Sequence, residues 1–163
     1  MSKENTTNAP YTTHFEKIAD MEAWVGKEIG LTDWMTIDQN RINQFAEATD
    51  DEQWIHTDPE RCAKESPFKT PIAHGFLVLS LASAMCYKAF SFGHISMGIN
   101  YGLDKVRFMN ATPVNAQLRG RVSLLTYDAI KGGAKYKVNI VFELEGAEKP
   151  ACIAEFVAIA YGA

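Results

Sequence analysis

The chain has 163 residues, 47% of them hydrophobic and 22% charged, with a formal net charge of −4. This length and composition suit one globular domain with a core of its own and argue against a wholly disordered chain. The acidic balance and the lack of a long Lys/Arg run argue against a non-specific nucleic-acid binder. We therefore expect a single domain at 14–163, preceded by a loose tail at 1–13.

Export and membrane insertion are not predicted either. Residues 1–15 are polar and lack the apolar segment of a signal peptide. No side chain from Thr70 to Tyr87 is charged, but this stretch is near the lower length limit for a membrane span and contains Pro71 and Gly75. The three cysteines are odd in number and far apart, which favours reduced thiols. The expected location is the cytoplasm.

The N-terminal third of the chain is predicted to hold short helices and one strand. Residues 15–24 favour a helix that ends near Gly26. Residues 28–37 are rich in β-branched and aromatic side chains, which favours a strand. An amphipathic helix is then expected after Asp38, whose side chain can cap its first turn.

Two more helices are predicted before residue 91. Asp58 can cap the first of them, and Pro59 suits its first position. The second, at 75–90, is apolar on nearly every face, and such a helix must be surrounded by other elements. We therefore expect it to be buried at the centre of the domain.

The second half of the chain is predicted to form strands that surround this helix. Alternating apolar and polar side chains, and a more uniformly apolar run near the C-terminal end, predict at least four of them. They lie at 98–109, 116–127, 134–146 and 151–161, with turn signals at 131–133 and 145–150. The simplest arrangement is an α+β fold in which an antiparallel sheet, apolar on one face, curves around the buried helix.

Two motifs flank the entrance to the predicted central helix. The stretch "FAEATDDEQWIHTDPERC" holds an Asp, four intervening residues and a His, and "TPIAHGF" follows at 70–76. Together they resemble the hydratase motif of the MaoC-like, (R)-specific enoyl-CoA hydratases. The variant "QWIH" and the later "INYGLDKVRF" are most similar to the nodulation protein N-like branch of 3-hydroxyacyl-thioester dehydratases. The resemblance covers residues 31–120 and implies a hotdog fold, assembled as a homodimer whose sheets join edge to edge.

Carried over residue by residue, the resemblance implies a set of site residues. Asp51 and His56 become the catalytic pair, and the backbone N–H of Gly75 becomes the oxyanion hole. Ser83 matches a family position that lies near the site and often carries a serine. It is therefore expected to bind substrate, with simple helix packing as the alternative.

Three further residues are candidates for substrate binding. Gln53 is expected at the entrance of the site and Asn100 on the strand that follows the central helix. For His74 a structural role is favoured, in which a ring hydrogen bond holds the loop. The chain departs from the commonest family pattern at Asp50, Gln53 and Trp54, where Gly or Glu, Asn, and Pro are usual. These departures leave substrate preference open.

Hydration of an enoyl thioester needs a base, a stabiliser of negative charge and a proton donor. Water has a pKa of about 15.7, so a positioned base must take its proton as it attacks Cβ. We expect Asp51 to accept that proton, while His56 orients the water and helps to protonate Cα. The charge on the thioester oxygen would meet the N–H of Gly75, at the positive end of a helix and with no Cβ in the way.

Neither a metal nor an organic cofactor is predicted. Asp51, His56 and His74 are acceptable ligand types, but the tight H-x-x-x-H spacing that supports a zinc site is missing from the sequence. The chemistry is therefore expected to rest on the side chains and backbone of the protein itself.

The predicted function is (R)-specific hydration of 2-enoyl thioesters, or dehydration of 3-hydroxyacyl thioesters, carried by coenzyme A or by acyl carrier protein. One alternative is a hotdog thioesterase, an enzyme that commonly uses a carboxylate on or beside the central helix. The absence of Asp and Glu between Lys69 and Lys88 disfavours it. The other alternative is a module that binds acyl thioesters without turnover.

Overall fold

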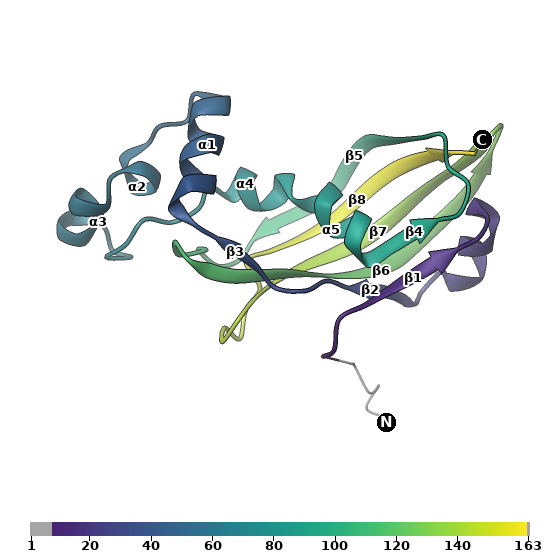
Figure 1. Ribbon diagram of the computed structural model, residues 1–163, viewed down its shortest axis with the longest axis horizontal. Helices are drawn as coiled ribbons and strands as arrows, with labels where there is room; N and C mark the ends of the chain where they lie inside the picture. The colour runs from purple at the N-terminus through teal and green to yellow at the C-terminus, as the bar shows by residue number, and fades with distance from the viewer. Residues whose placement is uncertain (1–7, 163) are drawn as a thin grey trace.

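A long, curved sheet forms the body of the molecule, and the helices lie against one of its faces and beyond one of its ends (Figure 1). The structure is a computed structural model, and it describes residues 8–162. The strands are β1 (Tyr11–Phe15), β2 (Glu28–Leu31), β3 (Met35–Ile37), β4 (Phe90–Phe92), β5 (Met97–Phe108), β6 (Ala116–Ile130), β7 (Gly133–Leu144) and β8 (Cys152–Tyr161).

The strands follow the order β4-β1-β2-β6-β7-β8-β5, and β3 pairs with β6 beside this path. Neighbouring strands are antiparallel, with one parallel pair, β1 and β4, in register from Thr13 opposite Phe90 to Phe15 opposite Phe92. The predicted antiparallel sheet is thus confirmed, apart from this pair. The sheet stays open, with β4 and β5 as its outermost strands.

Most helices lie in the N-terminal half of the chain. They are η1 (Ile18–Trp24, a 3₁₀ helix), α1 (Gln39–Thr49), α2 (Trp54–Thr57), α3 (Pro59–Glu65), α4 (Gly75–Ser80) and α5 (Ala82–Ala89). Both predicted N-caps are confirmed, because Asp38 accepts a hydrogen bond from the N–H of Arg41 (2.8 Å) and Asp58 from that of Arg61 (3.0 Å). Pro59 lies in the first turn of α3, as predicted. Together α1–α3 project beyond the end of the sheet (Figure 1).

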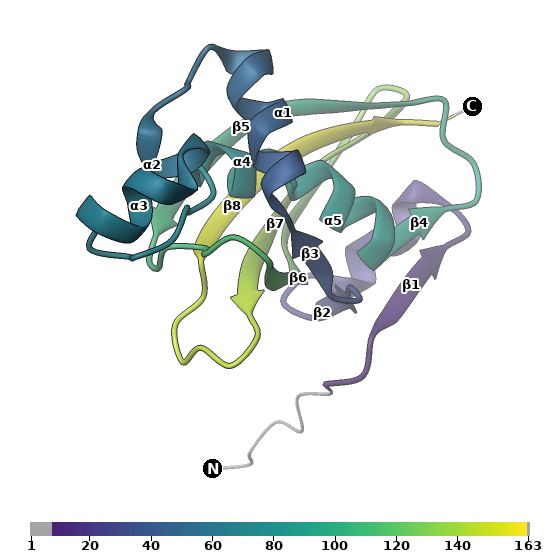
Figure 2. The same ribbon diagram turned by 60° about the vertical axis from the view of Figure 1, so that its left-hand side comes forward.

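The predicted central helix is present as α4 and α5, which lie against the concave face of the curved sheet (Figure 2). The helix is interrupted at Leu81, whose N–H bonds to the carbonyl oxygen of Val78 (3.2 Å) in a tighter turn than that of an α-helix. A glycine in β2 lets α5 approach closely, since a Cβ on Gly30 would lie 2.0 Å from the carbonyl oxygen of Ala89. No helix in the described part of the chain is long and apolar enough to cross a membrane.

Only one side of the central helix is buried, which corrects the expectation that it is surrounded. The buried side chains are Leu77, Val78, Leu81, Ala82, Met85, Cys86 and Ala89. On the other side, Phe76 is 68% exposed and Tyr87 is 78% exposed. The physical reason is that the sheet ends at β5, so no element between residues 8 and 162 covers this side.

The N-terminal segment also differs from its prediction. Strand β1 begins at Tyr11, so three residues expected in the tail lie in the sheet, whereas residues 1–7 lie outside the described part. The helix predicted at 15–24 is present as the 3₁₀ helix η1 but begins only at Ile18, because Phe15 ends β1, where it is buried and pairs with Phe92 of β4. The strand predicted at 28–37 is divided into β2 and β3, which both pair with β6.

Candidate active site

Asp51 and His56 lie on a segment whose path is set by a left-handed turn. Helix α1 ends at Asp50, which has φ 58° and ψ 22°, a conformation that favours Gly and tolerates Asp. The departure from the family pattern at Asp50 therefore falls where a glycine would also fit. Residues 51–53 then lead into the single turn of α2, which carries His56.

The ring of His56 is held in one tautomer. The side chain is only 6% exposed, and its Nδ1 lies 2.7 Å from the carbonyl oxygen of Ile72. Because a carbonyl oxygen can only accept, Nδ1 carries the hydrogen and neutral His56 presents Nε2 as an acceptor. The side-chain amide of Gln39 fixes the backbone by donating to the carbonyl oxygen of His56 (2.8 Å). His56 is thus oriented to accept a proton.

His74 contacts both members of the predicted catalytic pair. It precedes α4, is 2% exposed, and donates from Nε2 to the backbone carbonyl oxygen of Asp51 (2.9 Å), the kind of loop-holding bond that the sequence favours. Its ring stacks on His56, with ring centres 3.8 Å apart and planes 25° apart. The ring of Phe45 also contacts it, at 4.9 Å. The Nδ1 of His74 is buried and has no hydrogen-bond partner among residues 8–162.

The Asp51–His56–His74 cluster is compact enough to raise the question of a metal. One ligand-type atom from each residue lies within 4.8 Å of the others. Two histidines bind one metal through lone pairs that converge, and each lone pair lies in the plane of its ring. Because the stacked rings are only 25° apart, their lone pairs run nearly side by side. The Asp51 carboxylate and one ring nitrogen of His56 are close enough to share one water as two acceptors.

Gly75 and His56 line the same cavity, which has a volume of about 280 Å³. Gly75 is the first residue of α4, so its N–H has no partner within the helix. A Cβ on Gly75 would lie 3.1 Å from the ring of Phe108, which forms one wall. Thr112 lines the cavity too, and its hydroxyl is buried without a hydrogen-bond partner in the described chain. The cavity thus combines a proton acceptor with a helix-terminal N–H.

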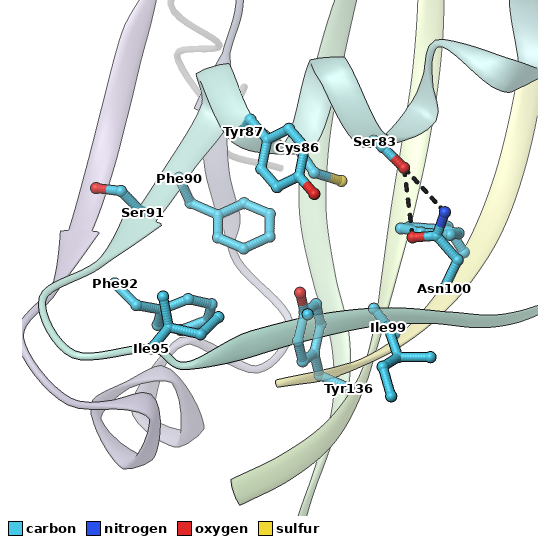
Figure 3. Close-up of a pocket in the computed structure, with 13 residues that line it drawn as sticks. Ser83, Cys86, Tyr87, Phe90, Ser91, Phe92, Ile95, Ile99, Asn100 and Tyr136 are labelled. Atoms are coloured by element: carbon cyan, nitrogen blue, oxygen red, sulfur yellow. Dashed lines mark hydrogen bonds between the residues drawn. The ribbon is translucent and has the colours of Figure 1, made fainter. Parts of the chain in front are cut away.

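Ser83 and Asn100 lie in a different cavity of the protomer (Figure 3). Asn100 Nδ2 donates to Ser83 Oγ (3.1 Å) beside an apolar space of about 220 Å³ between α5 and the sheet. Its aromatic walls include Phe90, Phe92, Tyr136 and Phe156. Ser83 follows Gly75 by eight residues and lies beyond the break at Leu81, in α5 and not in α4. Within one protomer, the structure does not bring Ser83 and Asn100 to the Asp51–His56 cluster.

Gln53 and Trp54 lie on the outer side of the cluster. Gln53 is exposed and forms the N-cap of α2 without a side-chain capping bond, so its role in substrate binding stays a prediction. The ring of Trp54 is half-buried, and the guanidinium of Arg61 lies 4.3 Å from its centre. This cation–π contact connects α2 to α3 and gives Trp54 a structural role.

Three residues around the cluster are not predicted as site residues from the sequence. Phe45 lies on the apolar face of the predicted α1, a pattern that indicates a core residue. Phe108 ends β5, and Thr112 lies in the turn that follows it. Their one sequence signal is the breaker-rich "NATP" at 110–113, which predicts a turn and says nothing of a cavity.

Comparison with known proteins shows which family the chain resembles over most of its length. Residues 20–143 match the family described as MaoC like domain. The 3-hydroxyacyl-thioester dehydratase Z of Mycobacterium tuberculosis is 43% identical over 144 residues, covering 88% of this chain and 95% of that protein. Nodulation protein N of Rhizobium meliloti is 42% identical over 149 residues, covering 90% and 92%.

Solved structures show the same fold. The unliganded R-hydratase of Pseudomonas aeruginosa superposes with a TM-score of 0.70 at 21% identity, covering 91% of this chain and 88% of that one. A regulatory protein from Archaeoglobus, described as a monoamine oxidase regulatory protein, gives a TM-score of 0.73 at 20% identity, with 93% and 98% covered. The predicted α+β hotdog fold is confirmed.

Proposed function

The chain belongs to the MaoC-like domain family, and on this premise we propose that it is a hydro-lyase acting on acyl thioesters. It adds water to 2-enoyl thioesters and dehydrates 3-hydroxyacyl thioesters, with the (R) stereochemistry that the motif resemblance implies. One observation carries the proposal: Asp51 and His56 each place a ligand-type atom within 4.8 Å of the other, and the ring of neutral His56 lines one cavity with Gly75. The 43% identity to a protein named 3-hydroxyacyl-thioester dehydratase supports the same reaction.

The first step places one water between Asp51 and His56. Both groups are acceptors, so the two O–H bonds of the water point at them and an oxygen lone pair is left free for Cβ. As the O–Cβ bond forms, Asp51 takes a proton from the water. His56 holds the water through Nε2, because its Nδ1–H is engaged by Ile72. Neutral His56 can therefore deliver only a proton that it has first accepted.

The second step moves charge onto the thioester oxygen. The π electrons of the Cα=Cβ bond shift towards the carbonyl, and the N–H of Gly75 donates to the oxygen that becomes negative. Apolar side chains around the cavity, such as Val78 and Phe108, exclude bulk water and strengthen this contact. The enolate then takes back a proton at Cα from the Asp51–His56 pair, which completes hydration. Dehydration follows the same steps in reverse.

We propose that coenzyme A or acyl carrier protein carries the acyl thioester, and that the protein is located in the cytoplasm. Coenzyme A and acyl carrier protein present the same thioester to the cavity, and either is consistent with this site. Cys62, Cys86 and Cys152 are all buried free thiols. Their reduced state supports a cytoplasmic location.

We also propose that a second copy of the chain covers β5. This strand ends the sheet order and is 12 residues long. Its apolar side chains are exposed, among them Met97 (51%), Tyr101 (62%) and Leu103 (43%), as are Phe76 and Tyr87 on the adjacent helix. An open edge beside a broad apolar face is typical of an interface, and a two-fold axis would cover it with the same surface of a second chain.

Such a dimer would bring the two cavities together. If a two-fold axis passes through the midpoint of β5, the two copies of β5 pair antiparallel, and Asn100 of the partner subunit lies opposite Lys105. Lys105 is near the end of β5 that carries Phe108. Phe108 forms a wall of the catalytic cavity. We therefore propose that Asp51, His56 and Gly75 act on a substrate whose acyl tail lies in the partner's apolar cavity, beside the partner's Ser83 and Asn100.

Hydration is tested by following the absorbance of the conjugated enoyl thioester in crotonyl-CoA and in a longer enoyl-CoA. We expect the absorbance to fall without release of free thiol, because hydration saturates the double bond and leaves the thioester intact. A thiol reagent in a parallel assay checks this. Thiol release would instead identify a thioesterase. Stabilisation by the ligand with neither signal would identify a non-catalytic binding module.

The pH dependence should report the burial of His56. Burial lowers the pKa of His56 below its ordinary value of 6.5 and His74 lowers it further, while the bond to Ile72 and the charge of Asp51 act in the opposite direction. Because neutral His56 is the active form, the midpoint of the acid limb of kcat/KM is expected to lie below pH 6.5.

The same shift has a consequence for stability. The unfolded chain binds a proton at His56 near pH 6.5, whereas the folded chain binds it only at lower pH. The contribution of His56 to the free energy of unfolding is therefore complete above pH 6.5 and is lost as pH falls towards the folded pKa. Circular dichroism over the same pH range separates loss of fold from loss of the active form. An acid limb of kcat/KM with its midpoint at or above pH 6.5 would contradict this prediction.

A further inference from the structure

We infer that His74 is a positioning residue that holds Asp51 and His56 in one reactive geometry. This inference rests on the proposed function. Its basis is that a single side chain makes two separate contacts, a hydrogen bond to the backbone of Asp51 and a ring stack against His56.

The hydrogen bond fixes the otherwise loosely held end of the pair. Asp51 follows the left-handed Asp50 and belongs to the irregular stretch 51–53 between two helices. Its carbonyl oxygen accepts from Nε2 of His74, a residue 23 positions away at the start of α4. The bond therefore ties the Asp51 backbone to the helix whose first N–H belongs to Gly75, the proposed oxyanion donor.

The ring stack with His74 fixes the orientation of the second member of the pair, His56. The bond between Nδ1 of His56 and the Ile72 oxygen leaves the ring free to tilt about that contact. The face of His74 lies against it at 3.8 Å, and Phe45 packs against His74 in turn. A side chain that is 2% exposed and confined by two rings has little freedom to move. His74 thus limits the tilt of His56 and keeps Nε2 directed at the shared water.

His74 performs this role without exchanging a proton with substrate. Its Nε2 hydrogen is used by Asp51, and its Nδ1 is buried. The proposed catalytic cavity is lined by His56 and Gly75 but not by His74. A change at His74 should therefore lower the rate of the chemical step and leave substrate affinity nearly unchanged.

Two substitutions separate the contacts. His74→Gln keeps an amide N–H near the position of Nε2 and removes the ring, whereas His74→Phe keeps the ring and removes the donor. We expect each to lower kcat by about 10- to 100-fold with KM changed by less than about twofold. His94→Gln, at an exposed histidine in the loop between β4 and β5, is the matched control and should keep the parent kcat and KM.

NMR provides a readout that does not depend on turnover. In His74→Phe we expect the backbone amides of residues 51–53 to shift, and in His74→Gln the ring ¹⁵N resonances of His56. If the parent hydrates crotonyl-CoA and both variants keep its kcat, the inference is overturned. If the parent shows no turnover, the proposed function fails. The NMR shifts then decide the inference alone, and two spectra without these changes overturn it.

Discussion

Asp51→Asn is expected to lower kcat by about 10²–10⁴-fold, the range that general acid–base groups contribute. The asparagine amide has nearly the shape of the carboxylate but cannot take a proton from the attacking water. Asp51 is exposed, and its bond to His74 uses the backbone carbonyl, which the substitution retains. The loss should therefore appear in kcat, with the thermal unfolding midpoint close to that of the parent.

His56 requires two variants, because its ring is buried. His56→Ala removes the acceptor but leaves the carbonyl of Ile72 without its donor, at a cost of about 1–3 kcal/mol in stability. His56→Asn retains a side-chain N–H near the position of Nδ1 and removes Nε2. We expect both to lower kcat by a factor similar to that of Asp51→Asn, and the asparagine variant to be the more stable of the two.

The control for these variants is again His94→Gln, whereas Gln53→Ala tests the predicted substrate contact between them. Gln53 is exposed, lies between Asp51 and His56 in the sequence, and makes no side-chain capping bond. It should keep kcat and at most raise KM if it meets substrate at the entrance. Near-parent rates in both Asp51→Asn and His56→Asn, on a substrate that the parent hydrates, would show that the catalytic pair is wrongly assigned.

Much of the local structure around the site can be predicted because it depends on short-range chemistry. Asp38 and Asp58 each accept a hydrogen bond from the backbone N–H three residues later. This contact is local, so it does not depend on where the helix lies in the fold. Periodicity likewise predicts the long strands. In β7, for example, buried and half-buried residues alternate along the whole strand. The spacing of Asp51, His56 and "AHG" predicts the catalytic segment, because the resemblance rests on the combination.

The geometry of the site depends on contacts that the sequence does not encode locally. The tautomer of His56 is set by Ile72, 16 residues away, and His74 reaches the carbonyl of Asp51 across 23 residues. No periodicity predicts either contact. The break at Leu81 and the parallel pairing of β1 with β4 are decided by packing as well. Ser83 is predicted near the site from family position, yet it lines the apolar cavity beside α5, whereas Gly75 lines the cavity of His56.

Because Ser83 and His56 line different cavities, two variants can test whether the cavities of two subunits form one shared site. Asp51→Asn disables the catalytic cavity, whereas Ser83→Phe is expected to fill the entrance of the apolar cavity and to remove the bond to Asn100. Each should be nearly inactive as a homodimer, since both of its sites carry the defect. In a mixed dimer with shared sites, one site combines both defects and the other has neither.

Mixed dimers carrying one copy of each variant are therefore expected to recover about half of the parent activity per dimer. Co-expression with two different affinity tags and purification over both resins isolates them, and size-exclusion chromatography confirms that they and the parent are dimers. Separately purified homodimers, mixed just before the assay, serve as the control and should stay inactive. If the mixed dimer is as inactive as its parents, the acyl cavity serves the catalytic pair of its own chain. Elution of the parent as a monomer would remove the shared site altogether, because β5 would then have no partner strand to bring Asn100 to the catalytic cavity.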